Sequence, residues 1–249
     1  MKIIIVGLWF AALALIERLR PAAPRPPGSE APRLTRNLGL WLGNTLMNPF
    51  VTLPISAVAA SFDLWSRPAT PFWVGLAFDL LLLDLWVYCW HRANHRWPLL
   101  WRFHRVHHLD QFLDTTSAVR FHPGEVLISA LARTPLLVAA DIPLISIASF
   151  DTIALAASLF HHSNVRLPAR VEAALRWLMV TPSHHWVHHH AVWRDTNSNY
   201  GTVLTLWDRV FRSWCPTART PDMAIGAEGM ADVALLQLAA KPFASGNGR

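Results

Sequence analysis

The chain has 249 residues, a length that suits one domain or at most two. Apolar residues make up 53% and charged residues 15%, whereas a soluble domain carries roughly 25% charged residues, so the composition indicates a membrane protein. The net charge is +6, but the arginines are scattered among apolar stretches without a lysine-rich tract, which excludes a nucleic-acid partner. Cys89 and Cys215 lie far apart in the chain and suggest neither a disulfide framework nor a cysteine-based zinc site.

The N-terminal region contains an apolar segment followed by a basic one. Residues 3–16 are uncharged but shorter than the roughly 20 residues of a straight spanning helix. We interpret them as a membrane anchor, and the alternative is a signal peptide. Residues 17–37 carry five arginines, which predict a cytoplasmic loop: Arg18, Arg20, Arg25, Arg33 and Arg36.

Two further stretches predict membrane spans. Residues 38–62 contain no charge, and Pro49 and Pro54 are expected to bend this second span. Residues 72–90 form the third predicted span. Its only charged side chains are Asp79 and Asp84.

Residues 126–160 are apolar again and are too long for one pass, so they predict a bent hairpin. Five residues interrupt them: Arg133, Pro135, Asp141, Pro143 and Asp151. If the first loop is cytoplasmic, the third span ends on the cytoplasmic side, and the hairpin begins and ends there. All 13 histidines lie between His91 and His190 and are therefore expected on that side.

The histidines fall into three groups with helical spacing. HRANH places His91 and His95 four residues apart, HRVHH places three histidines at i, i+3 and i+4 from His104, and HWVHH repeats this pattern from His185. Residues three or four apart share a helix face, and neutral imidazole is a good ligand for iron, zinc, copper and nickel. The eight imidazoles exceed what one tetrahedral zinc ion uses. The pattern therefore predicts a dinuclear metal site rather than a pH-sensitive patch or a histidine-rich tag.

The motifs HRANH, HRVHH, FHHSN and HWVHH, in this order between apolar spans, resemble those of the fatty acid hydroxylase superfamily. This superfamily includes sterol desaturases and the hydroxylases of fatty acids, sphingolipids and carotenoids. RFHP, NYG and LWDRVF agree with the resemblance, which covers about residues 75–215. It implies an all-α fold, with a membrane-embedded helical bundle, a cytoplasmic histidine-lined cap, two metal ions and oxygen-dependent oxidation of a lipid-like C–H bond.

The resemblance also implies a set of metal ligands. They are His91, His95, His104, His107, His108, His162, His185, His188 and His189. Members with ten ligands have a further histidine where this chain has Ser158. His122 or His161 could fill that place, or water could. His122 could instead orient a ligand or face the substrate, and His161 could pack beside His162, while His184 and His190 are expected at the periphery.

Other polar residues are candidates for supporting the metal site. Asp84 lies on one helical stripe with Tyr88, His91 and His95, where its carboxylate could accept the free ring N–H of a ligating histidine. Asp79 lies off this stripe, and we expect it to hydrogen-bond a neighbouring helix. Four further residues could orient ligands: Asn164, Asp195, Asn199 and Tyr200. The sequence NYG at 199–201 is equally typical of a turn.

We therefore expect a membrane-bound di-iron oxidoreductase that uses O2 to hydroxylate, or desaturate, a sterol, fatty acyl, sphingoid or carotenoid substrate drawn from the bilayer. An acid–base pair cannot attack an unactivated C–H bond, whereas iron with O2 can. Zinc could replace iron in a purified or crystallised sample. The chain has no room for a fused haem or flavin domain, so we expect electrons from a separate ferredoxin, cytochrome or reductase.

Two other functions are open at this point. A membrane zinc hydrolase would use metal-activated water, but the sequence has no His-Glu-x-x-His pattern. A non-enzymatic metal-binding membrane protein is the other. The expected organisation is an N-terminal anchor and basic loop (1–37), a catalytic domain (38–215) and a C-terminal tail (216–249).

Overall fold

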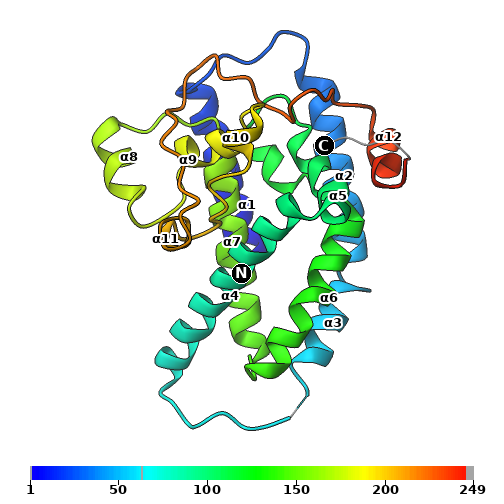
Figure 1. Ribbon diagram of the computed structural model, residues 1–249, viewed down its shortest axis with the longest axis vertical. Helices are drawn as coiled ribbons and strands as arrows, with labels where there is room; N and C mark the ends of the chain where they lie inside the picture. Colours follow the sequence, from blue (N-terminus) through cyan, green and yellow to red (C-terminus); the bar gives the residue numbers. More distant parts are fainter. Residues whose placement is uncertain (1, 63, 245–249) are drawn as a thin grey trace.

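The computed structural model describes residues 2–62 and 64–244, and within them it contains helices and three isolated β-bridges but no strand. The expected all-α fold is therefore confirmed for this part of the chain. Long helices extend toward one end of the molecule, and short helices gather at the other end, drawn at the top of Figure 1. We call this upper part the cap.

Two helices are long and apolar enough to cross a membrane: α4 (Phe72–Arg96) and α7 (Leu144–His162). The hairpin expected at 126–160 is also confirmed, because α6 (Pro123–Ala139) precedes α7 and a short turn joins them. Asp141 makes this turn with a φ of 50°. The outer faces of these helices carry exposed apolar side chains, among them Phe78, Leu131 and Ile153, as expected of surfaces that contact lipid.

The span expected at 38–62 is interrupted at Pro49, as predicted, but the chain breaks there into two helices, and Pro54 lies inside the second of them. The chain forms α2 (Glu30–Met47) and α3 (Thr52–Ala59), with a turn at residues 48–51 between them. Pro49 lies in that turn, where its ring and missing N–H end the regular helical bonding. The helix α2 also begins inside the loop expected at 17–37.

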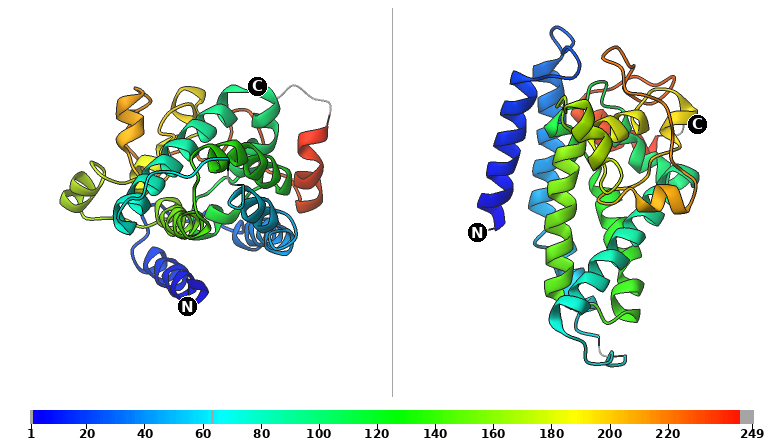
Figure 2. Two further views of the ribbon diagram at one scale, coloured as in Figure 1. Left: turned by 90° about the horizontal axis from the view of Figure 1, so that it is seen from below. Right: turned by 90° about the vertical axis from the view of Figure 1, so that its left-hand side faces the viewer.

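The first helix, α1 (Lys2–Leu19), packs along α7, as the right-hand view of Figure 2 shows. The indole Nε1 of Trp9 donates a hydrogen bond to the carbonyl of Ala156 at 3.0 Å. At its upper end the buried carboxylate of Glu17 accepts hydrogen bonds from the backbone N–H groups of Thr115 and Asn164. The expected anchor is thus an integral part of the helical bundle.

Arg33 does not lie in an exposed basic loop, as the sequence suggested. Its side chain is buried on α2 and donates to Asp110 at 2.6 Å and to Asp114 at 2.9 Å. A buried guanidinium requires paired charge, and these two carboxylates provide it. The ion pairs fix α2 to the loop that follows the second histidine box.

The cap consists of short elements around the upper ends of the long helices (Figure 1). These are α5 (Pro98–His108), η1 (Thr115–Val119), α8 (Ala169–Leu175), α9 (Pro182–His188), α10 (Trp193–Thr196), α11 (Leu206–Val210) and η2 (Lys241–Phe243).

The C-terminal tail packs onto the cap. Its helix α12 (Leu235–Ala240) buries Leu238 completely in a core cluster. Asp232 pairs with the buried guanidinium of Arg120 at 2.5 Å. The tail therefore contributes both an apolar contact and a buried ion pair to the cap.

Candidate metal centre

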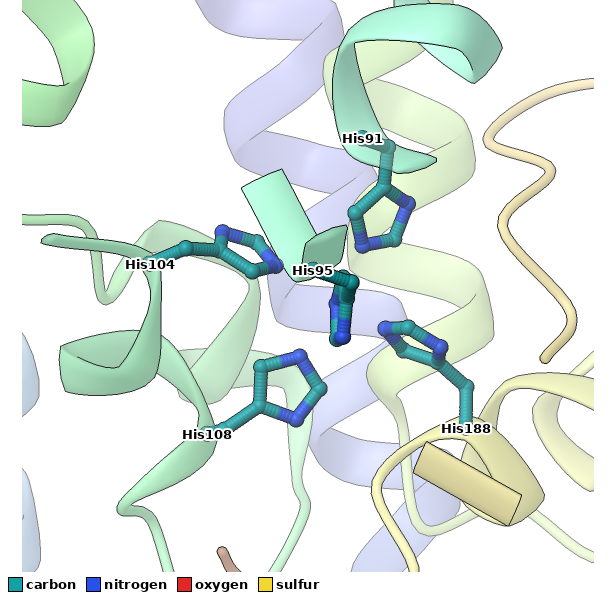
Figure 3. Close-up of side chains that lie close together, drawn as sticks. All are labelled: His91, His95, His104, His108 and His188. Carbon is teal, nitrogen blue, oxygen red and sulfur yellow. The ribbon is translucent and has the colours of Figure 1, made fainter. Parts of the chain in front are cut away.

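Nine histidines converge in two adjacent groups, and they are the nine that the resemblance implied. In each group, one ring nitrogen from every histidine lies within 4.8 Å of those of the others. The first group contains His91, His95, His104, His108 and His188, and the second contains His107, His162, His185 and His189. Figure 3 shows the five rings of the first group turned toward a common centre.

The second and third histidine boxes are each divided between the two groups. His104 and His108 join the first group, whereas His107 joins the second. In the third box the division is reversed, and only its middle member, His188, joins the first group. Adjacent residues on a helix point about 100° apart, so α5 and α9 can each serve two centres. Histidines that share a helix face by their spacing are therefore divided between two groups in these two boxes.

In the second group, two ring nitrogens that carry no hydrogen face each other. Nδ1 of His162 donates to the carbonyl of Ser158 at 2.8 Å, and Nδ1 of His107 donates to that of Arg120 at 3.2 Å. The Nε2 atoms of these two rings therefore carry lone pairs, yet they lie 3.1 Å apart. Burial, reinforced by the neighbouring imidazoles, lowers the pKa of His107 and His185 well below the usual range and favours their neutral forms. Facing lone pairs on neutral rings fit a bound cation.

The first group shows the same arrangement. Nδ1 of His91 donates to the carbonyl of Tyr200 at 2.9 Å, and Nδ1 of His188 donates to that of Ser198 at 2.7 Å. Nε2 of both rings is buried and has no hydrogen-bond partner among the described residues. Hydrogen bonds of this kind fix the tautomer of a metal-binding histidine. Both groups therefore fit transition-metal ions that prefer imidazole.

Glu125 supports His104 and was not recognised in the sequence. Its Oε1 accepts a hydrogen bond from Nδ1 of His104 at 2.6 Å, and its Oε2 is buried with no partner in the described part of the chain. Its place in the first turn of α6 is readable from the sequence, since Pro123 marks a helix start. The contact itself joins residues 21 apart, which no local pattern reveals.

Asp84 does not support a histidine, contrary to our expectation. Its carboxylate accepts hydrogen bonds from the backbone N–H groups of Val203 and Leu204 and from the indole of Trp207. Asp84 and His91 share a stripe of α4, but seven residues of helix separate them by about 10 Å. Asp84 therefore connects α4 to the loop before α11.

Asp79 behaves as expected. It accepts a hydrogen bond at 2.6 Å from Ser146 on the neighbouring helix α7. Its other contact is an ion pair with Arg67 at 2.7 Å.

The candidates for the tenth ligand position differ in their surroundings. Both ring nitrogens of His122 are engaged, one by the backbone N–H of Gly124 and one by the carbonyl of Ala239, so His122 caps α6 and lies outside both groups. His161 lies beside the second group, with its ring centroid 4.1 Å from that of His185. Its Nδ1 is buried without a partner in the described residues.

The other candidate supporting residues stabilise cap loops. Tyr200 contacts a histidine of the centre, through its backbone carbonyl. Asn164 binds the backbone of Ala23, and Asn199 binds the carbonyl of His184. Asp195 accepts a hydrogen bond from the peripheral His190 at 2.8 Å, and Asp208 contacts the peripheral His184 at 3.2 Å.

A cavity of about 400 Å³ opens beside the two groups and runs between α4, α6 and α7. Five histidines of the groups lie along one end of it: His91, His104, His107, His162 and His185. Its walls are largely apolar or small, with side chains such as Val87, Ala130 and Leu155. A concave apolar site with a few polar groups is typical of a small-molecule or lipid pocket.

The chain matches the family model described as fatty acid hydroxylase over residues 76–213. It is 29% identical to the ornithine lipid hydroxylase OlsE of Rhizobium tropici, over 95% of this chain and 76% of that protein. It is 30% identical to the alkylglycerol monooxygenase of Danio rerio, over 57% of this chain and 30% of that protein. A cholesterol 25-hydroxylase-like protein of the same fish is 30% identical over 55% of this chain and 53% of that protein. No solved structure matches the chain.

The chain thus spans less than two thirds of the alkylglycerol monooxygenase and of the cholesterol 25-hydroxylase-like protein. The family model nevertheless covers more than half of this chain, and the matched region includes all nine converging histidines. Relatives across this region are named hydroxylases and monooxygenases. The chain is an enzyme of the fatty acid hydroxylase family.

Proposed function

We propose that this enzyme is a membrane-bound, O2-dependent di-iron monooxygenase that hydroxylates a C–H bond of a lipid. The observation that carries the proposal is the pair of adjacent all-histidine groups at the end of an apolar cavity. Two iron ions held there would supply the oxidising power that an unactivated C–H bond requires. The relatives' names favour hydroxylation over desaturation.

The protein's own residues would hold the ligands and position the substrate. Backbone carbonyls of Tyr200, Ser198, Ser158 and Arg120 fix four histidine tautomers, so the free nitrogens stay turned inward. The apolar walls of the cavity would accept a hydrocarbon chain and exclude water. Placement of one carbon within about an ångström would then select the bond that reacts.

We further propose that α4 and α7 cross the membrane and that the histidines face the cytoplasm. Exposed arginines gather on the cap, including Arg20, Arg170 and Arg194, whereas the loop at residues 60–71 contains only Arg67. This asymmetry follows the positive-inside rule. The same basic surface would attract an acidic electron-transfer protein.

A labelling experiment tests the orientation. In a Cys89→Ala background, Ser66→Cys reports on the 60–71 loop and Ala169→Cys reports on the cap. Labelling of intact cells with a membrane-impermeant maleimide should modify only the Ser66→Cys protein. Labelling of the Ala169→Cys protein instead would reverse the orientation.

The reaction is tested with the purified, iron-loaded protein, a reductant, ¹⁸O2 and a lipid extract. We expect two iron ions per chain and a product that gains one ¹⁸O atom. A product that only loses two hydrogens would show a desaturase, and hydrolysis with zinc and no O2 uptake would show a hydrolase. The His107→Ala protein serves as the control that should form no product.

A further inference from the structure

The end of the cavity away from the histidines contains an ion pair between two apolar helices. Arg133 on α6 donates to Asp151 on α7 at 2.6 Å, and it also reaches the hydroxyl of Ser56 on α3 at 3.3 Å. Both charged residues line the cavity. The pair therefore joins three helices inside the apolar half of the molecule.

One face of α6 and one face of α7 line the cavity from this ion pair to the histidines. On α6 the lining residues are Glu125, Val126, Ser129, Ala130 and Arg133. On α7 they are Asp151, Ala154, Leu155, Ser158, His161 and His162. Each set follows the spacing of one helix face. The axial distance between the two ends is about 12 Å along α6 and about 16 Å along α7.

An ion pair in this position is costly unless it has a role. Charged residues within membrane-spanning segments are expensive and usually serve a functional site. Apolar residues often replace buried ion pairs without loss of stability, so joining three helices does not by itself require one. The side chain of Asp151 is 51% exposed, whereas that of Arg133 is 13% exposed. Oxygen lone pairs of Asp151 therefore remain accessible to a ligand.

The charge of the pair limits what it can bind. Arg133 and Asp151 neutralise each other, so a charged ligand group would leave a net charge at this depth. A neutral hydrogen-bond donor would add a bond to the carboxylate without that penalty. A lipid hydroxyl and an amide N–H share this chemistry.

We propose that Arg133 and Asp151 bind the polar group of the lipid substrate, a hydroxyl or an amide N–H, and thereby determine which carbon lies beside the histidines. This inference rests on the proposed function, because it concerns the substrate of the same centre. The reacting carbon is then the one about 12–16 Å from the bound polar group.

Equilibrium binding of radiolabelled lipids to the iron-loaded protein without reductant tests this proposal. The probes are a long-chain alcohol, the corresponding amide and an alkane of equal length. The wild type should prefer the alcohol or the amide over the alkane by roughly ten- to a hundredfold, as expected for a hydrogen bond to a charged group. Which of the two binds better identifies the donor.

The double variant Arg133→Met/Asp151→Leu removes the pair without leaving an unpaired charge. It should bind all three probes about equally, while its affinity for the alkane stays at the wild-type level. Asp151→Asn is the milder variant, which keeps a neutral acceptor and should retain a preference below about tenfold. Arg18→Met/Glu30→Leu removes an exposed pair that does not line the cavity and should retain the full preference.

An unchanged preference for the alcohol or amide in both Asp151 variants would overturn the proposal. Loss of affinity for every probe, including the alkane, would also overturn it, because the pair would then only support the helices. Binding requires no turnover, so these results are independent of the ¹⁸O2 assay. In the ¹⁸O2 assay, the wild type should hydroxylate one carbon position. The double variant, which keeps the metal centre but lacks the ion pair, should give products hydroxylated at several positions.

Discussion

Glu125 and His104 form a hydrogen bond of 2.6 Å that joins the first turn of α6 to α5 at the first histidine group. Here the carboxylate of a side chain fixes the orientation of a converging imidazole. Backbone carbonyls do so for four of the other rings. A negative charge at this place would strengthen a ligand that faces a metal cation.

Replacing Glu125 should therefore weaken metal binding. We expect Glu125→Leu to lower the affinity roughly 10- to 100-fold, and Glu125→Gln to lose less, because its amide oxygen still accepts the Nδ1–H bond. Competition with a chelator measures both effects. Glu30→Gln, on an exposed residue, is the control, and equal affinity of the wild type and the Leu variant would disprove the role.

His107 and His190 provide a second contrast. His107 belongs to the second group, so His107→Ala should reduce the iron content by about one ion per chain and abolish turnover. His190 contacts Asp195 outside the groups, and His190→Ala should retain both ions. Elemental analysis of the two purified proteins measures the number of iron ions per chain. A full complement of iron in the His107→Ala protein would remove His107 from the ligand set.

Much of the candidate centre is predictable from the sequence, because helical spacing alone brings imidazoles to shared faces. The sequence cannot assign them to two groups. His107 and His108 are neighbours in the chain, yet they serve different groups: His108 lies with the histidines of α4, and His107 lies with those of α7 and α9. That division depends on tertiary packing, which spacing does not encode.

Charged residues show the same limit in the fold. Arg33 reads as part of a basic loop, but it is buried because Asp110 and Asp114, some 80 residues further along the chain, provide its counter-charges. The long helices α4 and α7 can be predicted from the sequence, because their length and apolar composition are sufficient. The break between α2 and α3 is marked by Pro49, but the start of α2 inside a basic segment depends on that distant ion pair.

The contacts of Asp84 change the expected effect of its substitution. Oδ1 of Asp84 accepts from the N–H of Val203, and Oδ2 accepts from those of Leu204 and Trp207. Asp84→Asn replaces one of these oxygens by an NH2 group, so at least one N–H donor loses its acceptor. We expect the loss of a charged hydrogen bond to destabilise the protein by about 2 kcal/mol and to leave the metal affinity unchanged. Thermal unfolding in detergent and chelator competition measure the two quantities. A lower metal affinity with unchanged stability would restore a supporting role at the metal site.

Asp110 predicts how the stability of the cap depends on pH. Burial alone would raise its pKa, but the guanidinium groups of Arg33 and Arg120 lower the pKa from 3.8 to about 2. Because the pKa is lower in the folded state, the carboxylate stabilises the fold above about pH 4, and this contribution is lost as the pH falls toward 2. Asp110→Asn leaves Arg33 with one carboxylate partner, Asp114, and should destabilise the protein by about 3–5 kcal/mol at neutral pH. The difference in unfolding temperature between wild type and variant should shrink as the pH is lowered from about 5 to about 2. Asp222→Asn, at a fully exposed residue, is the control, and a difference that stays constant over this range would contradict the role assigned to the Asp110–Arg33 pair.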